Sequence, residues 1–231
     1  MFSEIKDILD RGIATDLLNA EKATFIFWQL AINANAINSS VDYKKEFLAY
    51  IQELTFNESI MALARIYDKP DRRYPNRCII RLINKLKELY AEAPAITHKE
   101  MLTEQAKQYD LPDYLIQDIL NNNSKCFAKH FACHMENEYQ TPTFQSNIKE
   151  LKTIRDKSVS HNEMHDEVLS ITLPVQHSLI EFAKKFICMV DLAFFNTLHV
   201  VNGQFILTDI AKHTGANLPQ ILSDMGIFIH N

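Results

Sequence analysis

Residues 175–201 read VQHSLIEFAKKFICMVDLAFFNTLHVV, and this stretch decides the fold class. Its first half keeps a polar stripe of Glu181, Lys184 and Lys185, but its second half carries apolar side chains on nearly every side. A helix that is apolar nearly all round is buried from more than one side, in a core or at a subunit interface. We therefore expect an almost wholly buried helix over 175–201, with core positions at Phe186, Val190 and Phe194.

The helical pattern continues outward from this stretch. Apolar residues recur at helical spacing in six further segments, which are 15–38, 42–67, 77–91, 98–109, 112–139 and 143–160. Thr15 or Asp16 is expected to cap the first of these helices. The chain of 231 residues has only 4 glycines and 7 prolines, too few for the many tight turns of an all-β protein.

These patterns predict an all-α fold, an antiparallel helical bundle of about five to seven helices. The bundle is expected to occupy residues 1–201. Residues 202–231 contain three of the four glycines and are expected to form a C-terminal extension or a helical hairpin packed on the bundle. Hydrophobic residues make up 47% of the chain and charged residues 23%, a composition that excludes global disorder.

The net charge of the chain and its cysteine content exclude several classes of protein. The net charge of −5 excludes a general nucleic-acid coating protein, which is basic over its whole surface, but leaves room for local basic patches. The four cysteines form no CxxC pair, and the N-terminus lacks the apolar core of a signal peptide, so we expect a cytoplasmic protein with reduced thiols. The apolar runs FIFWQLAI and FICMVDLAFF are too short or too interrupted to span a bilayer, and no membrane association is expected.

The segment LKTIRDKSVSHNE (151–163) carries the residues best suited to chemistry, which are Arg155, Asp156 and His161. Arginine is a permanent cation with a fork of donors that fits phosphate oxygens. Histidine is the side chain best suited to move a proton near neutral pH. Asp156 is placed to orient either group. Together they supply what metal-free RNA cleavage needs, a base for the 2′-hydroxyl and a cation for the phosphate.

Helix geometry limits this interpretation. On an ideal α-helix, the six-residue step from Arg155 to His161 leaves the two side chains about 120° apart. They converge only if the helix ends before His161, or if a second copy of the motif faces the first. The alternative interpretation is a helix C-terminus that carries surface charges without a catalytic role.

Two short patches resemble the HEPN superfamily. RDKSVSH resembles the family signature of an arginine, a polar residue and a histidine four to six residues later, with Arg155, Asp156 and His161 at those positions. It is most similar to the branch associated with abortive phage infection, with Arg-Asp-Lys at 155–157, a small residue before the histidine, and Glu163 where that branch tends to have Asp. SIMALARIYDKPDRR (59–73) resembles the same branch's helix that ends in a turn, here Tyr67-Asp68-Lys69.

The resemblance implies a helical bundle, a homodimer and, in active members, an endoribonuclease site at the dimer cleft that needs no metal or other cofactor. His161 would then be the general base or acid, Arg155 the phosphate clamp and Asp156 the orienting residue, and the products would end in a 2′,3′-cyclic phosphate. A role in phage defence, or a toxin-like role with an antitoxin or other protein partner, also follows from the resemblance. Some members only bind or scaffold, so the alternative is a catalytically silent module that binds RNA or a protein.

A local basic patch adds candidates for RNA binding. Between residues 65 and 87 there are eight basic and two acidic residues, and the candidates for phosphate contacts are Arg72, Arg73, Arg77 and Arg81. The alternative is a solvated helix face whose charge is neutralised by acidic segments such as 88–118.

Two further patterns have ordinary structural explanations. Cys126, His130 and Cys133 share one helix face in CFAKHFACH (126–134) and could bind a metal, but we expect packing there and no metal site. LTDIAKHTGANLPQILSDM (207–225) resembles a helix-turn-helix, with Ala211, Gly215 and Ile221 at the expected spacing. A DNA-binding regulator is therefore a second alternative function, although a plain helical hairpin explains the same pattern.

Overall fold

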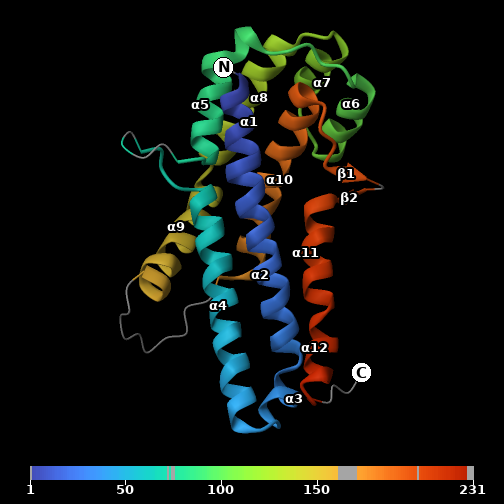
Figure 1. Ribbon diagram of the computed structural model, residues 1–231. Helices are drawn as coiled ribbons and strands as arrows, with labels where there is room; N and C mark the ends of the chain where they lie inside the picture. The colour runs from blue at the N-terminus through green and yellow to red at the C-terminus, as the bar shows by residue number, and fades with distance from the viewer. Residues whose placement is uncertain (1, 72, 74–75, 161–170, 202, 228–231) are drawn as a thin grey trace.

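Figure 1 shows the computed structural model, which describes residues 2–71, 73, 76–160, 171–201 and 203–227. Within these ranges the structure is helical apart from one two-stranded hairpin, so the all-α prediction is confirmed. Strands β1 (Val200–Val201) and β2 (Gln204–Phe205) pair antiparallel. The helices in chain order are α1 (Phe2–Ile8), α2 (Thr15–Ile32), α3 (Ala34–Asn38), α4 (Asp42–Ile66), α5 (Ile79–Leu89), α6 (Lys99–Gln108), α7 (Asp113–Leu120), α8 (Ser124–Tyr139), α9 (Pro142–Ile154), α10 (Leu173–Phe195), α11 (Ile206–Ala216) and α12 (Leu218–Asp224).

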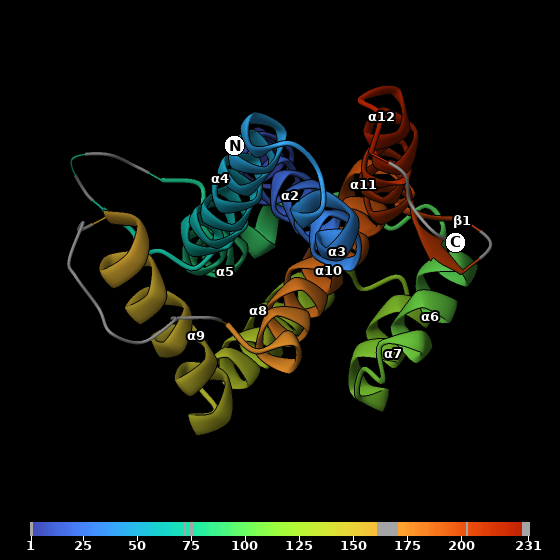
Figure 2. The same ribbon diagram turned by 90° about the horizontal axis from the view of Figure 1, so that it is seen from below.

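Helix α10 lies in the middle of the molecule, as the apolar pattern predicts. Phe186 and Val190 have no exposed surface, and Phe194 is almost fully buried. Figure 2 shows α10 with α2 on one side, α8 and α9 on a second, and α6 and α7 on a third. The ring of Phe186 packs edge-on against Phe131 of α8, and that of Phe194 against Phe2 of α1. These aromatic contacts join elements from both ends of the chain into one core.

The end of this helix differs from the prediction. Helix α10 stops at Phe195 rather than at residue 201, because Asn196 adopts the left-handed conformation (φ 53°) that terminates helices. The residues expected to continue the helix instead lead into the hairpin of β1 and β2.

Helices α1 and α2 form one continuous rod through a π-helical segment, Leu9–Ala14, so the predicted cap at Thr15 or Asp16 is wrong. The Thr15 hydroxyl donates to the Asp10 carbonyl (2.8 Å), and the Asp16 carboxylate accepts a hydrogen bond from Arg65 (2.8 Å). Gly12 lies in the π-helical segment against the chain at Arg77. A Cβ atom on Gly12 would lie 2.2 Å from the Arg77 Cβ, so this close approach requires glycine.

Asparagines divide two of the predicted helices. The helix expected over 15–38 breaks at Asn33, which lies between α2 and α3. The helix expected over 112–139 breaks between α7 and α8, where Asn122 is left-handed (φ 55°) and the Asn123 side chain accepts a hydrogen bond from the Cys126 backbone N–H (3.3 Å). Asparagine tolerates the left-handed region and caps helices well, which explains why a long apolar pattern is interrupted here.

The lower halves of α2 and α4 project beyond the start of α10 together with α3, α12 and the lower end of α11 (Figure 1). This part has its own small core, formed by Leu30, Ile37, Leu48, Leu222 and Ile227. Higher up, α11 is held by a buried ion pair of Lys184 and Glu21 (3.0 Å), because the Thr208 hydroxyl also donates to Glu21 (2.8 Å). The C-terminal segment therefore packs on the bundle as a covering layer over α2.

Helices α11 and α12 lack the turn of a helix-turn-helix. Gly215, expected in that turn, lies inside α11 against Phe25, where a Cβ atom would come within 2.9 Å of the Phe25 Cβ. Only Asn217 separates the two helices, and its backbone angles are those of a right-handed helix. In Figure 1 both helices follow α2 in the same direction, so they do not form a hairpin either.

None of the helices in the described ranges is both long enough and apolar enough to cross a membrane.

Candidate catalytic site around Arg155

Helix α9 positions Arg155 at its C-terminal end. Thr141 caps the helix by accepting a hydrogen bond from the Phe144 N–H (3.4 Å), and Pro142 occupies the first turn, where its missing N–H does no harm. The apolar side of α9 is buried against the core, with Phe144, Ile148, Leu151 and Ile154. This packing turns the polar side of the helix end, including Arg155, toward the surface.

The Arg155 guanidinium is held by two carboxylates. Its Nη1 donates to Asp68 Oδ1 (2.9 Å), and its Nε donates to Asp156 Oδ1 (2.8 Å). The Arg155 side chain is 22% exposed, so solvent still reaches it. Partial burial opposes the charge on Arg155, but the bonds to Asp156 and Asp68 outweigh it and raise the pKa above the ordinary value. Arg155 is therefore a fixed cation at the surface.

Tyr67 places Asp68 beside Arg155. The Tyr67 backbone N–H bonds to the carbonyls of Leu63 and Ala64 and ends α4, and its ring is fully buried. The ring packs edge-on against Phe144 of α9 (5.8 Å between centroids), and its hydroxyl donates to the Leu179 carbonyl of α10. Because Tyr67 ties the end of α4 to α9, the next residue along the chain reaches the end of α9.

Lys152 belongs to the same cluster and was not singled out from the sequence. It lies one turn before Arg155 on α9, and burial lowers the pKa of its ammonium group. The Asp68 carboxylate opposes this shift, while the positive charge of Arg155 reinforces it. The available signal was the i, i+3 spacing, which puts Lys152 and Arg155 on one helix face.

The predicted catalytic histidine, His161, lies outside the described residues. The chain leading to it, Arg155–Ser160, is a π-helix rather than an α-helix. A π-helix has hydrogen bonds from residue i to i+5 and so more residues per turn than an α-helix, and π-helical turns are frequent at functional sites. The angle expected between Arg155 and His161 on an ideal α-helix therefore does not apply to this segment.

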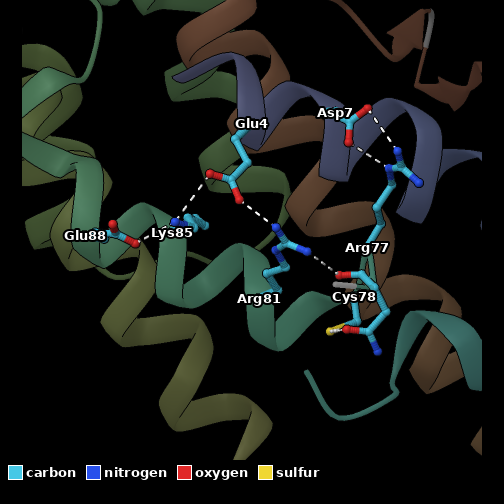
Figure 3. Close-up of polar contacts among 8 residues, drawn as sticks. Glu4, Asp7, Arg77, Cys78, Arg81, Lys85 and Glu88 are labelled. Carbon is cyan, nitrogen blue, oxygen red and sulfur yellow. Dashed lines mark hydrogen bonds and ion pairs between the residues drawn. The ribbon is translucent and has the colours of Figure 1, made fainter. Parts of the chain in front are cut away.

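Two of the predicted RNA-binding residues are paired with carboxylates of α1. Figure 3 shows Arg77 bonded to Asp7 (2.7 Å) and Arg81 bonded to Glu4 (2.7 Å). The Arg81 guanidinium holds the pKa of Glu4 below its usual value, and Arg77 does the same for Asp7. In this structure the two guanidiniums fasten α5 and the segment before it to α1.

Three more basic residues of the patch are similarly paired with carboxylates. Acidic partners come from α1, α2, α4, α5 and α8 rather than mainly from 88–118, and the pairs are Arg65 with Asp16 and Glu58, Lys85 with Glu4 and Glu88, and Lys87 with Glu136. Arg73 is exposed, whereas Arg72 lies outside the described residues. The charges of Arg65, Arg77, Arg81, Lys85 and Lys87 are thus offset by carboxylates, most of which are distant in the chain.

The cysteine–histidine face of α8 makes other contacts. His130 Nδ1 lies 2.7 Å from Asp118 Oδ2 of α7, and His134 lies 3.2 Å from Glu138. Cys126 and Cys133 are free thiols. Among the described residues, no group of three or more histidine, cysteine, aspartate or glutamate side chains is arranged to hold a metal ion.

Comparison with known proteins identified no relative of this chain. No family model matches the sequence. No curated protein and no solved structure is significantly similar to the chain. The functional argument therefore rests on the residues and their geometry.

Proposed function

We propose that this chain is a metal-independent endoribonuclease of the HEPN type that acts as a homodimer. The observation that carries the proposal is the contact between Arg155 and Asp68, which are 87 residues apart in the chain. It joins the two sequence patches that resemble the family, the Arg155-Asp156-Lys157 segment and the Tyr67-Asp68-Lys69 turn, at one place on the surface. Two sequence patches that each resemble the family are expected to lie together if they form a catalytic site, but not if they only carry unrelated surface charges.

In the proposed reaction, His161 removes the proton of a ribose 2′-hydroxyl, and the 2′-oxygen attacks the adjacent phosphorus. The bond from phosphorus to the 5′-oxygen of the next nucleotide breaks, and that oxygen takes up a proton. Lys152 is the residue proposed to give this proton, because it lies one turn before Arg155 on α9 and burial lowers the pKa of its ammonium group. The products are a 2′,3′-cyclic phosphate and a 5′-hydroxyl.

Arg155 stabilises the charge that develops on the phosphate oxygens during this step. Its Nη1 group, now bonded to Asp68, would turn to the phosphate, while Asp156 keeps its bond to Nε and fixes the plane of the guanidinium. RNA binding therefore requires Asp68 to release Arg155. The resemblance places such an enzyme in phage defence or a toxin-like role, in which an antitoxin or another protein partner holds it in check.

A second candidate is a catalytically silent module that binds RNA or a protein. The observation that favours it is the same pair of carboxylates, because Asp68 and Asp156 together occupy both edges of the Arg155 guanidinium. The DNA-binding alternative has less support, since α11 and α12 lack the required turn.

The test uses the purified full chain with single-stranded RNA and DNA of the same sequence, with and without EDTA. We expect RNA alone to be cut, because DNA lacks the 2′-hydroxyl, and we expect EDTA to leave the rate unchanged. His161→Ala should lower the rate by about 10² to 10⁴, the usual contribution of a positioned acid–base group. Arg11→Ala is the control, because Arg11 is 78% exposed and belongs to the other π-helical segment.

Two outcomes would decide against the proposal. Cleavage that survives His161→Ala and disappears with EDTA would contradict the metal-independent mechanism. RNA that binds the pure chain and stays intact would identify the silent module instead.

A further inference from the structure

The outer side of α4 carries a row of large apolar side chains that face solvent. Their exposed fractions are 70% for Tyr43, 54% for Phe47, 57% for Tyr50 and 44% for Leu54. They follow one another at steps of four, three and four residues, which aligns them along one side of the helix. The buried residues of α4 lie on the opposite side, roughly 150° away at 3.6 residues per turn. The row therefore contributes nothing to the core of this chain.

One edge of this row is acidic. Glu46 and Glu53 are exposed and lie along that edge, each about one turn from Ala49 and so about two turns from each other. Within the described residues, neither carboxylate has an ion-pair partner, in contrast to Asp42, which pairs with Lys45 (3.3 Å). On the other edge, Lys44 is occupied by a hydrogen bond to the Met225 carbonyl. In the described part of the chain, the apolar row thus has two unpaired carboxylates along one edge, while the Lys44 ammonium lies over the Tyr43 ring at one end of the other edge (5.9 Å to the centroid).

We propose that this row, Tyr43, Phe47, Tyr50 and Leu54, binds an amphipathic helix of a partner protein that carries basic residues beside its apolar seam. Steps of four and three are the spacing of a helix–helix seam, and the residues flanking the seam choose the partner by charge. Tyrosine and phenylalanine are enriched where such interfaces have their strongest contacts. Lysine or arginine on the partner would neutralise Glu46 and Glu53.

Charge also argues against other occupants. In an antiparallel pair of two α4 helices, the flanking rows face each other, so Glu46 and Glu53 would meet their own copies. Nucleic acid and anionic membranes are repelled by the same carboxylates. The row contains no residue of the proposed nuclease site, so the two proposals stand or fall separately.

The experiment measures the binding of two fluorescently labelled helical peptides to the full chain by anisotropy. The peptides share a leucine seam and differ only at the flanking positions, which are all lysine in one and all glutamate in the other. We expect the lysine peptide to bind at least tenfold more tightly. The double variant Glu46→Lys with Glu53→Lys should reverse this preference, an outcome that a general loss of folding cannot produce.

Tyr50→Glu should weaken binding of the lysine peptide at least tenfold, whereas Leu120→Glu, on α7 and 49% exposed in the parent, should leave it unchanged. Circular dichroism establishes that each variant is folded. Equal binding of the two peptides, or an equal loss in the Leu120 control, would overturn the proposal. A dimer of the chain at micromolar concentration that Phe47→Glu dissolves would assign the row to a second copy and overturn it as well.

Discussion

At the scale of single residues, Arg155 combines two carboxylate partners with access to solvent. It is bound by Asp68 and Asp156 and yet remains partly exposed. A phosphate can replace one carboxylate without leaving the cation bare, because the planar guanidinium offers several donors at once. The bond to Asp68 therefore sets how readily Arg155 accepts RNA.

Substitution of Arg155 tests this role. Arg155→Ala should lower RNA cleavage by about 10² or more through lost charge stabilisation, with the fold intact. Arg155→Lys should rescue the rate poorly, because an ammonium group cannot copy the planar fork. Asp68→Asn should instead tighten RNA binding, since the amide competes less strongly for the guanidinium. Single-turnover kinetics measure the cleavage rates of the Arg155 variants, and filter binding measures the RNA affinity of the Asp68 variant. Full activity of Arg155→Lys would contradict the proposed role of the planar guanidinium.

Glu138 links stability to pH at the residue scale. Burial pushes its pKa upward, but hydrogen bonds with His134 and Lys185 outweigh burial and hold the pKa below the usual value. A carboxylate with a lowered pKa in the folded state stabilises the protein above its unfolded pKa, and this stabilisation is lost as the pH falls through the folded value. Glu138 contributes this way because Lys185 lies 2.9 Å from it.

We expect Glu138→Gln to reduce the free energy of unfolding at neutral pH by about 1 kcal/mol, a figure kept low because solvent screens this half-exposed pair. The difference between variant and parent should shrink as the pH falls below the ordinary glutamate pKa. Urea unfolding at a series of pH values measures it. Glu92→Gln, at an exposed position, is the control, and a difference that stays constant on acidification would rule out this linkage.

At the scale of elements, α10 is the helix on which the others are assembled. Its ring contacts reach α1 through Phe194 and α8 through Phe186, and the Tyr67 hydroxyl binds its backbone from the end of α4. The candidate site depends on this arrangement, because Tyr67 at the end of α4 packs on Phe144 of α9 and bonds to the backbone of α10. Loss of packing in α10 should therefore weaken the whole domain rather than one region.

Phe194→Ala should lower the free energy of unfolding by roughly 3–5 kcal/mol, the usual range for removing a buried aromatic ring. Phe195→Ala is the matched comparison and should lose less, because its ring is only half-buried beneath Lys6. Equilibrium unfolding in urea gives both values. If Phe194→Ala lowers the free energy of unfolding by less than about 1 kcal/mol, the Phe194 ring is not part of a tightly packed core.

At the scale of the whole molecule, the end of α9 with Arg155 lies at the side of the bundle rather than between its layers (Figure 2). One chain presents one such site to solvent. A two-fold axis beside α9 would bring two copies of the site together, as an isologous interface requires. The resemblance to the HEPN superfamily implies a nuclease site at a dimer cleft, so the proposed nuclease is expected to need this assembly.

Light scattering should therefore report a dimer at micromolar concentration. Thr153→Glu, on the exposed side of α9, should give a monomer without RNA cleavage, because it replaces a neutral side chain by a carboxylate that meets its own copy across the axis. Lys125→Glu introduces a carboxylate at an exposed position of α8 and should leave the dimer intact. A parent chain that is monomeric at this concentration would contradict the dimer.

Much of the fold followed from local sequence. The apolar residues of 175–201 predicted a buried helix with Phe186, Val190 and Phe194 in the core, and the structure agrees. Residues 42–67 and 98–109 similarly became α4 and α6 with nearly the predicted bounds. Periodicity is reliable here because a helix face is set by neighbours three and four residues away, which the sequence displays directly.

Helix ends were less predictable. Asn196 and Asn122 stop helices through their own backbone conformation, and apolar periodicity carries no information about that choice. The rod from α1 to α2 shows the reverse, because Thr15 was a good cap by residue type and yet lies inside a continuous helix. Packing of the 76–78 segment against Gly12 accompanies this continuity and involves residues far apart in the chain.

Local sequence patterns were enough to predict the helical class, the buried α10 and the two patches that contain Arg155 and Asp68. The contact between these two residues, and the pairing of Arg77 and Arg81 with Asp7 and Glu4, could be seen only in the folded chain. The physical reason is one of range. Helix formation depends on neighbours within a turn, whereas each of these ion pairs joins residues about 70 or more positions apart and exists only because helices pack side by side.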